Sequence, residues 1–183
     1  DRAGAIARTV DLVARLTDVG PDDGTANDDP AVVVGGLGRY RVDVANEGPD
    51  ATTGPVTVSV DVPDGMVAIS AVGDGWECAL GATVECTSSA AIQDGDAAPP
   101  VVVGVAVGSG ALVDDGSDDD PDLAIGTATA TVSGGGLDRD TSNDADGEST
   151  RVRRDVDVAL TGVLSGTTPI APGARVDWIL TPI

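Results

Sequence analysis

Residues 56–62 are Val56-Thr57-Val58-Ser59-Val60-Asp61-Val62, with a valine at every second position. Successive side chains of a β-strand point to opposite faces of a sheet, so this stretch predicts a strand with one buried valine face and one polar face. The turn-forming residues Pro63-Asp64-Gly65 follow it directly. A half-buried strand of this kind is typical of an antiparallel sheet.

The same alternation recurs along most of the chain, and helical periodicity is nearly absent. Further alternating runs cover residues 10–16, 40–44, 101–107 and 128–132. Short runs separated by Gly, Pro, Asn and Asp clusters predict about nine strands. The fold class we expect is all-β, an antiparallel β-sandwich. An up-and-down barrel is the alternative architecture.

The chain is strongly acidic. Its 183 residues include 31 Asp or Glu against 10 basic residues, all of them Arg, which gives a formal net charge of -21 without any His. The lack of His excludes Ser-His-Asp and Cys-His catalysis and imidazole metal sites. The lack of Lys excludes Schiff-base chemistry and Walker-type phosphate loops. The negative charge opposes binding to nucleic acid.

The acidity has two competing explanations. A GC-rich genome favours this composition without any functional cause. Life in high salt or outside the cell favours it because carboxylates keep a protein hydrated. The longest apolar stretch, Val101–Val107, is interrupted by Gly104 and is too short for a membrane helix, so we expect no membrane insertion. The chain begins at Asp1 without a basic or apolar leader, so we expect that any signal peptide has been removed.

The two cysteines, Cys78 and Cys86, predict a disulfide. If residues 81–83 form a hairpin turn, Cys78 lies directly opposite Cys86, close enough for a cross-strand bridge. A metal or redox site is the alternative, but the spacing is wrong and the chain offers no other soft ligand. A disulfide implies an oxidising compartment and hence an extracellular or cell-surface location.

The chain also repeats itself. The run beginning at Asp11 reappears at Asp155, 144 residues later, and the run containing Tyr40 has a counterpart around Trp178, 138 residues later. We therefore expect three parts: an N-terminal segment (1–9), one β-sandwich module (10–154), and the first two strands of a second, similar module or a strand-donating arm (155–183).

Several motifs resemble a known family, the immunoglobulin-like conserved repeat of bacterial and archaeal surface proteins called "domain of unknown function eleven". The motifs are Tyr40-x-Val42-x-Val44-x-Asn46-x-Gly48-Pro49-x-Ala51, Val62-Pro63-x-Gly65, Trp76-x-Cys78 with Val84-x-Cys86, residues 126–133 with 140–143, and residues 155–178. The resemblance implies an immunoglobulin-like sandwich in an extracellular tandem array that acts as stalk, spacer or adhesive surface. It carries over no catalytic residues.

The only cofactor candidate is calcium. Residues 114–122 form the densest cluster of oxygen ligands, and calcium prefers six to eight hard oxygens. The candidate ligands are Asp114, Asp115, Asp118, Asp119, Asp120 and Asp122. The spacing does not match an EF-hand, and a solvated loop in an Asp-rich chain is the competing interpretation. A second acidic run, 138–148, has a calcium-loop composition but is better interpreted as a turn plus linker.

The C-terminal segment predicts a self-association surface. Its apolar residues are Val156, Val158, Leu160, Val176, Trp178 and Leu180. Two strands alone are marginal in water and would leave this face exposed. Either the sequence is a fragment of a longer tandem protein, or the segment adds to a neighbouring copy by β-augmentation.

The function we expect is that of an extracellular structural module in a cell-surface array, stalk or filament, which self-associates through strand edges. Its partners would be other copies of itself or neighbouring modules of the same chain. The alternative is an adhesin that grips glycan or protein through its loops, with calcium assisting. No Asp or Glu pair stands out as a catalytic pair and aromatic residues make up only 2% of the chain, so we do not expect an enzyme.

Overall fold

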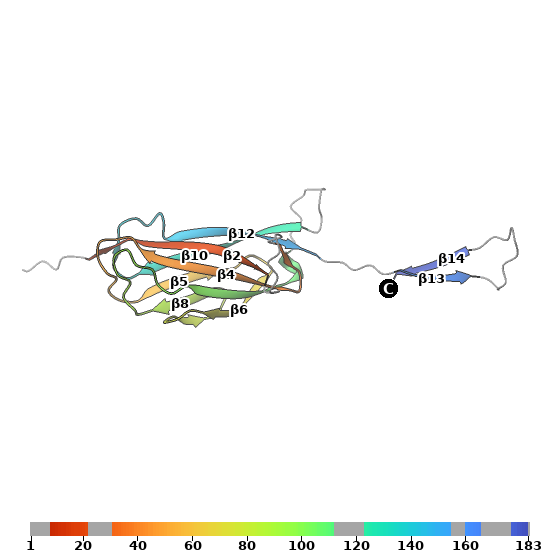
Figure 1. Ribbon diagram of the computed structural model, residues 1–183, viewed down its shortest axis with the longest axis horizontal. Helices are drawn as coiled ribbons and strands as arrows, with labels where there is room; N and C mark the ends of the chain where they lie inside the picture. The colour runs from red at the N-terminus through yellow and green to blue at the C-terminus, as the bar shows by residue number, and fades with distance from the viewer. Residues whose placement is uncertain (1–7, 22–30, 112–122, 155–159, 166–176, 183) are drawn as a thin grey trace, which may run out of the picture.

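The computed structural model describes residues 8–21, 31–111, 123–154, 160–165 and 177–182. Two sheets pack face to face (Figure 1). The six-stranded sheet has the order β3 (Val32–Val33), β12 (Ala145–Arg153), β10 (Leu123–Gly134), β5 (Val56–Asp61), β8 (Thr83–Ser88), β7 (Glu77–Ala79). The four-stranded sheet has the order β2 (Leu12–Pro21), β4 (Leu37–Asn46), β9 (Val101–Val107), β6 (Met66–Val72).

The pairing within both sheets is antiparallel except between β12 and β3. A short parallel pair, β1 (Thr9–Val10) with β11 (Leu137–Asp138), closes one end, and one 3-10 turn spans Ser109–Ala111. The structure confirms the predicted all-β, immunoglobulin-like sandwich. The two sheets do not join into one closed sheet, so the barrel alternative is wrong for the described residues.

Alternation in the sequence becomes alternation in burial. Val56, Val58 and Val60 on β5 are fully buried, whereas Thr57 and Ser59 between them are partly exposed. Strand β9 repeats the pattern, with four buried valines. The core is therefore aliphatic and built largely from valines that face each other across the two sheets. Burial of these side chains is the main source of stability for the fold.

One polar chain crosses this core. Tyr40 on β4 is almost completely buried, and its hydroxyl lies 2.8 Å from Thr150 Oγ1 on β12. The Thr150 hydroxyl donates to Asp18 Oδ2 on β2 at 2.7 Å, so Tyr40 is the donor in the first bond. Burial raises the pKa of Tyr40 to about 12. The chain ties the two sheets together with all three side chains hydrogen-bonded.

The predicted turn at Pro63-Asp64-Gly65 requires its glycine. Gly65 has a φ of 78°, and a Cβ there would lie 2.0 Å from the backbone nitrogen of Ala111. Any side chain at this position would therefore displace the 3-10 turn that packs against it. The turn then leads into β6 through a hydrogen bond from the Met66 nitrogen to the Pro63 oxygen.

The C-terminal strands β13 (Leu160–Ser165) and β14 (Asp177–Pro182) form an antiparallel sheet of their own. Trp178 pairs with Leu164, and its counterpart in the first copy, Tyr40, pairs with Asp18. An identical register would place Trp178 opposite Gly162, so the pairing is shifted by two residues. The predicted division into two modules stays a prediction.

Candidate functional site

The cysteine hairpin forms as predicted. Strand β7 pairs with β8 with Cys78 directly opposite Cys86, and the two residues are joined by a disulfide. Cys86 is completely buried, so the bridge fastens β7 to the core side of the six-stranded sheet. This bond ties β7 covalently to the neighbouring strand β8.

Trp76 stands next to this hairpin and is 8% exposed. Its indole nitrogen donates to the backbone oxygen of Pro99 at 2.7 Å, and its ring belongs to the core cluster. The ring therefore fills the end of the core. The buried ring is therefore not available to stack on a sugar.

The second edge, β2 of the four-stranded sheet, is closed by polar groups from β11, from β12 and from the turn between them. Asp138 Oδ2 accepts a hydrogen bond from the Leu12 nitrogen at 2.8 Å, and Asp146 Oδ2 accepts one from the Leu16 nitrogen at 2.8 Å. Between them, the Ala14 nitrogen donates to the backbone oxygen of Asn143 at 3.1 Å. Every second amide along this part of β2 is thus occupied, and another strand cannot pair with it there.

These carboxylates belong to the second acidic run of the sequence, and their hydrogen bonds show a structural use for them. Among the described residues, no group of three or more acidic side chains is arranged to hold a metal ion. Asp144 Oδ1 is nevertheless buried without a hydrogen-bond partner. Burial, reinforced by the negative charges of Asp138, Asp11 and Asp140, raises the pKa of Asp144. The first calcium candidate, Asp114 to Asp122, lies outside the described residues.

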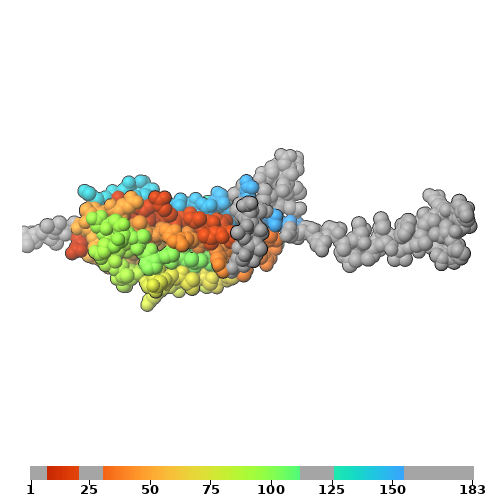
Figure 2. Space-filling view, viewed as in Figure 1, coloured from red at the N-terminus to blue at the C-terminus, as the bar shows by residue number. Residues whose placement is uncertain are grey.

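The third edge, β6, is open. It pairs with β9 on one side, and in the part of the chain that the structure describes no strand pairs with its other side. β6 contains no charged residue, and its large side chains are exposed: Val67 at 64%, Ile69 at 49% and Val72 at 64%. The strand lies along the lower edge of the sandwich (Figures 1 and 2).

β6 is not among the strands that the alternating runs of the sequence predict. Its alternation is interrupted by a register shift between Ala68 and Ser70, so it does not show a strict period of two. The signal that could have found it is the seven-residue stretch Met66–Val72, which is free of charge in a chain that is 22% charged.

The C-terminal hairpin holds part of the predicted self-association surface. Leu160 lies on β13, and Trp178 and Leu180 lie on β14. Leu160 pairs with Pro182 and Trp178 with Leu164. The other three residues of this surface lie outside the described residues: Val156, Val158 and Val176. For β13 and β14 the structure describes the backbone pairing and not the side chains. The structure therefore brings the two strands together without testing their apolar face.

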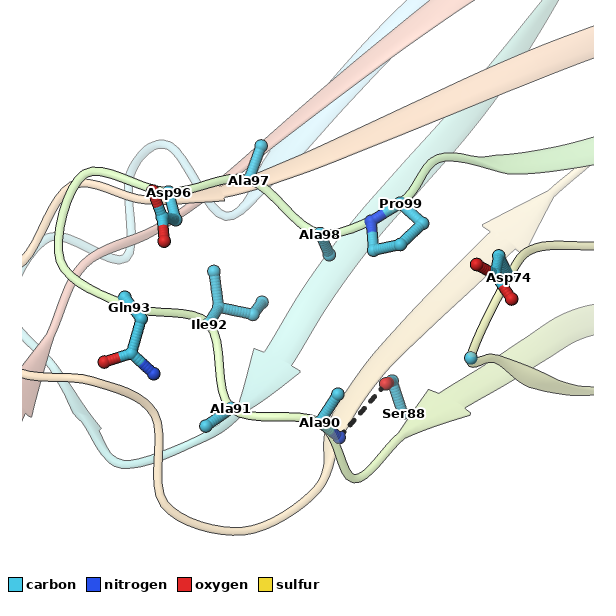
Figure 3. Close-up of a pocket in the computed structure, with 11 residues that line it drawn as sticks. Asp74, Ser88, Ala90, Ala91, Ile92, Gln93, Asp96, Ala97, Ala98 and Pro99 are labelled. Atoms are coloured by element: carbon cyan, nitrogen blue, oxygen red, sulfur yellow. Dashed lines mark hydrogen bonds between the residues drawn. The ribbon is translucent and has the colours of Figure 1, made fainter.

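A hollow of about 300 Å³ opens between the loop that follows β6 and the loop that follows β8 (Figure 3). Its walls are Asp74, Gly75, Ser88, Ala90, Ala91, Ile92, Gln93, Asp96, Ala97, Ala98 and Pro99. None of these side chains is aromatic, so the hollow offers no stacking surface for a sugar ring. Nothing in its lining favours the adhesin alternative.

The sequence matches no family model and no curated protein. Among solved structures, the chain is similar to the CARDB domain of the PF1109 protein from Pyrococcus furiosus, solved in complex with di-metal ions, with a TM-score of 0.48 and 14% identity over 83% of this chain and 97% of that one. It is also similar to a non-cellulosomal cohesin from Archaeoglobus fulgidus, with a TM-score of 0.39 and 12% identity over 81% and 92% of the two chains. The major pilin subunit BcpA of Bacillus cereus gives a TM-score of 0.41 and 12% identity over 81% and 42%.

Likenesses at such low identity and with TM-scores below 0.5 do not transfer the ligands or assemblies of those proteins to this chain. Among the described residues, no helix is long and apolar enough to cross a membrane.

Proposed function

We propose that this chain is an extracellular structural module of a surface array, stalk or filament, and that it self-associates by strand addition at the β6 edge. The added strand would come from the β13–β14 hairpin of another copy or of a neighbouring module. The observation that carries the proposal is the contrast in how the edges are treated. At β2, carboxylates occupy backbone amides, and the outer strand of the other sheet, β7, is only three residues long. By contrast, β6 is seven residues long, open and apolar.

Open edges are normally guarded. Proteins protect an exposed strand edge with charged residues, prolines, bulges or a covering segment, because unpaired backbone groups recruit other strands. β6 has the register shift at Ala68/Ser70 as its one such device, and it carries no charge and no proline. In a chain with a net charge of -21, a charge-free edge is the place where two copies repel each other least.

The β13–β14 hairpin supplies a suitable partner for this edge. A two-stranded sheet is marginally stable in water by itself, and pairing with a third strand is a common way to stabilise it. β13 has the sequence Leu160-Thr161-Gly162-Val163-Leu164-Ser165, which is also free of charge. Backbone hydrogen bonds would supply most of the affinity in such a contact, and alternate side chains would supply the specificity.

The covalent chemistry supports the proposed location. The Cys78–Cys86 disulfide is favoured in an oxidising compartment, and an acidic coat suits a protein exposed to the outside medium. The resemblance to the immunoglobulin-like conserved repeat of surface proteins supports the same location and a tandem, non-enzymatic role. We therefore place the module in the mechanical class, with span and self-association as its activity.

A variant that ends at Arg154 tests the proposal. The buried core runs from Val10 to Val152, so this variant should fold without residues 155–183. Sedimentation velocity over a range of concentrations should show growing species for the full chain and a monomer for the variant. Adding a peptide of residues 155–183 to the shortened variant should produce a complex. Equal growth by both proteins would overturn the assignment of the hairpin as the donor.

A further inference from the structure

The two outer faces of the sandwich carry different chemistry. Register places an apolar row across three strands of the four-stranded sheet, Leu37 on β4, Ala106 on β9 and Val67 on β6. Val72 continues this apolar side, opposite Val102. The charged residues that point outward from this sheet are Arg15, Arg39, Arg41 and Asp43. Among the described strand residues, this face therefore has a positive balance in a chain of net charge -21.

The outer face of the six-stranded sheet is covered with hydroxyl groups and acids. Its exposed or half-buried hydroxyl side chains are Thr57, Ser59, Thr83, Thr87, Thr127, Thr129, Thr131, Ser133 and Ser149. Three acids, Asp61, Glu77 and Glu85, gather on the neighbouring strands β5, β7 and β8. The basic residues on this face are Arg151 and Arg153, and both lie on β12, toward the opposite side of the sheet from β7.

We propose that the outer face of the four-stranded sheet docks onto the outer face of the six-stranded sheet of a second copy. Charge complementarity selects this occupant, because the arginine-bearing face of one copy meets the acid-bearing face of the next. Complementary potentials steer an encounter and fix its orientation. The apolar residues Leu37, Val67 and Val72 would meet the methyl groups of the threonines.

The layout of the two faces sets the orientation of the second copy. The arginines lie on β2 and β4, whereas the acids of the other face lie toward β7. Within one sandwich β2 packs near β12, and β6 packs near β7. Simple translation would therefore place arginines over threonines and valines over acids. If the second copy is rotated by half a turn about the axis along which the copies stack, both mismatches disappear. The arginines of one copy then lie over the acids of the next, and the valines lie over the threonines.

The contact is heterologous, because it joins two different faces, and it does not close on itself. Repetition produces an open stack rather than a dimer. Four strands of about seven residues cover roughly 19 by 23 Å, less than the ~800 Å² per partner of a standard interface. A single contact is thus weak, and it becomes effective when many copies are already aligned. It is separate from the strand addition proposed above and stands or falls without it.

A charge-swap experiment on the full chain tests this docking. One variant carries Arg15→Glu with Arg39→Glu, which makes both faces acidic. The other carries Glu77→Arg with Glu85→Arg, which makes both faces basic. Sedimentation equilibrium and small-angle scattering at high protein concentration should show face-to-face association for the wild type, a loss of roughly tenfold or more for each variant alone, and recovery in an equimolar mixture of the two.

The control is Asp64→Arg with Asp94→Arg, which makes the same charge change as the second variant at exposed positions in the turns. This control should associate as strongly as the wild type. If the mixture fails to recover association, or if the control loses it equally, the docking is wrong and the Arg face takes a different acidic partner. The variant that ends at Arg154 separates the two proposals: loss of strand addition leaves the charge-swap pattern intact, and failure of the charge swap leaves the role of the hairpin untouched.

Discussion

The two edges of the four-stranded sheet have been treated in opposite ways. At β2, Asp138 and Asp146 accept hydrogen bonds from the Leu12 and Leu16 amides, and the edge is closed. At β6, Val67, Ile69 and Val72 are exposed, and no strand among the described residues pairs with the outer side. The difference shows what the abundant aspartates do in this fold: some of them occupy backbone donors that would otherwise recruit another chain. The absence of such capping at β6 is therefore specific to that edge and is not a general property of the sheet.

The largest expected effect comes from opening the closed edge. Asp138→Ala combined with Asp146→Ala should lower the free energy of unfolding by about 2–4 kcal/mol, because two partly buried amides lose charge-assisted hydrogen bonds. Urea denaturation measures this loss. Asp64→Ala with Asp94→Ala is the matched control and should stay within about 0.5 kcal/mol of the wild type. A similar, small effect of both pairs would show that β2 does not depend on these carboxylates.

Reduction of the disulfide tests how β7 is held at the edge of the six-stranded sheet. Cys78→Ser with Cys86→Ser should cost roughly 2–3 kcal/mol in the chain-entropy model, because the bridge closes a short loop. The same loss should follow treatment of the wild type with a reductant, since these are the only two cysteines of the chain. An unchanged denaturation midpoint after reduction would mean that pairing with β8 alone holds β7.

A charge on the open edge should weaken strand addition without affecting the fold. Ile69→Lys introduces a charged side chain of the kind that protects edge strands in natural proteins. We expect association to weaken roughly tenfold or more, while the free energy of unfolding changes by less than about 0.5 kcal/mol. Gln93→Lys, at an exposed loop position outside both proposed contacts, is the control for added charge and should leave association intact. Sedimentation velocity measures both. Normal association of Ile69→Lys would exclude β6 as the acceptor.

Tyr40→Phe probes the polar chain behind the closed edge. Loss of the bond to Thr150 should cost about 1 kcal/mol at neutral pH, because Thr150 keeps its bond to Asp18. The pKa of Tyr40 is raised from 10.0 to about 12 by burial. Above pH 10 the phenol of Tyr40 ionises in the unfolded wild type but stays neutral in the folded protein. The free energy of unfolding of the wild type therefore falls as the pH rises toward 12. The difference between the two proteins should therefore shrink above pH 10. A constant difference would contradict burial of a neutral phenol.

The smallest effects are expected at the loop that leads into β12. Burial raises the pKa of Asp144, so its negative charge is a cost that is present at neutral pH and disappears as the carboxylate is protonated in acid. Asp144→Asn should raise the melting temperature slightly at pH 7 and leave it unchanged near pH 3. The hydrogen bonds from Ser142 lower the pKa of Asp140, so Asp140→Asn should destabilise at pH 7 and lose that effect as the pH falls through the folded pKa. Shifts of equal sign for both variants would contradict these assignments.

Much of the fold could be predicted because two signals survive without tertiary context. Strict alternation identifies β5 and β9, and the spacing of Cys78 and Cys86 identifies their pairing across a hairpin. β6 could not be predicted because its bulge interrupts the two-residue alternation of the strand. The roles of Asp138 and Asp146 could not be predicted either, because each carboxylate accepts a hydrogen bond from an amide that is more than a hundred residues away in the sequence. Which of many aspartates caps an edge depends on how the sheets pack, and no local pattern encodes that.

Hydrogen exchange at β6 tests self-association at the open edge most directly. Deuterium uptake should be followed by mass spectrometry on peptides that cover β6 and β2, at low and high concentration of the full chain. We expect exchange in Met66–Val72 to slow roughly tenfold or more as the chain associates, while exchange in Leu12–Pro21 stays constant. If the particles grow and the exchange of β6 remains at its dilute rate, strand addition at this edge is not how the chain associates.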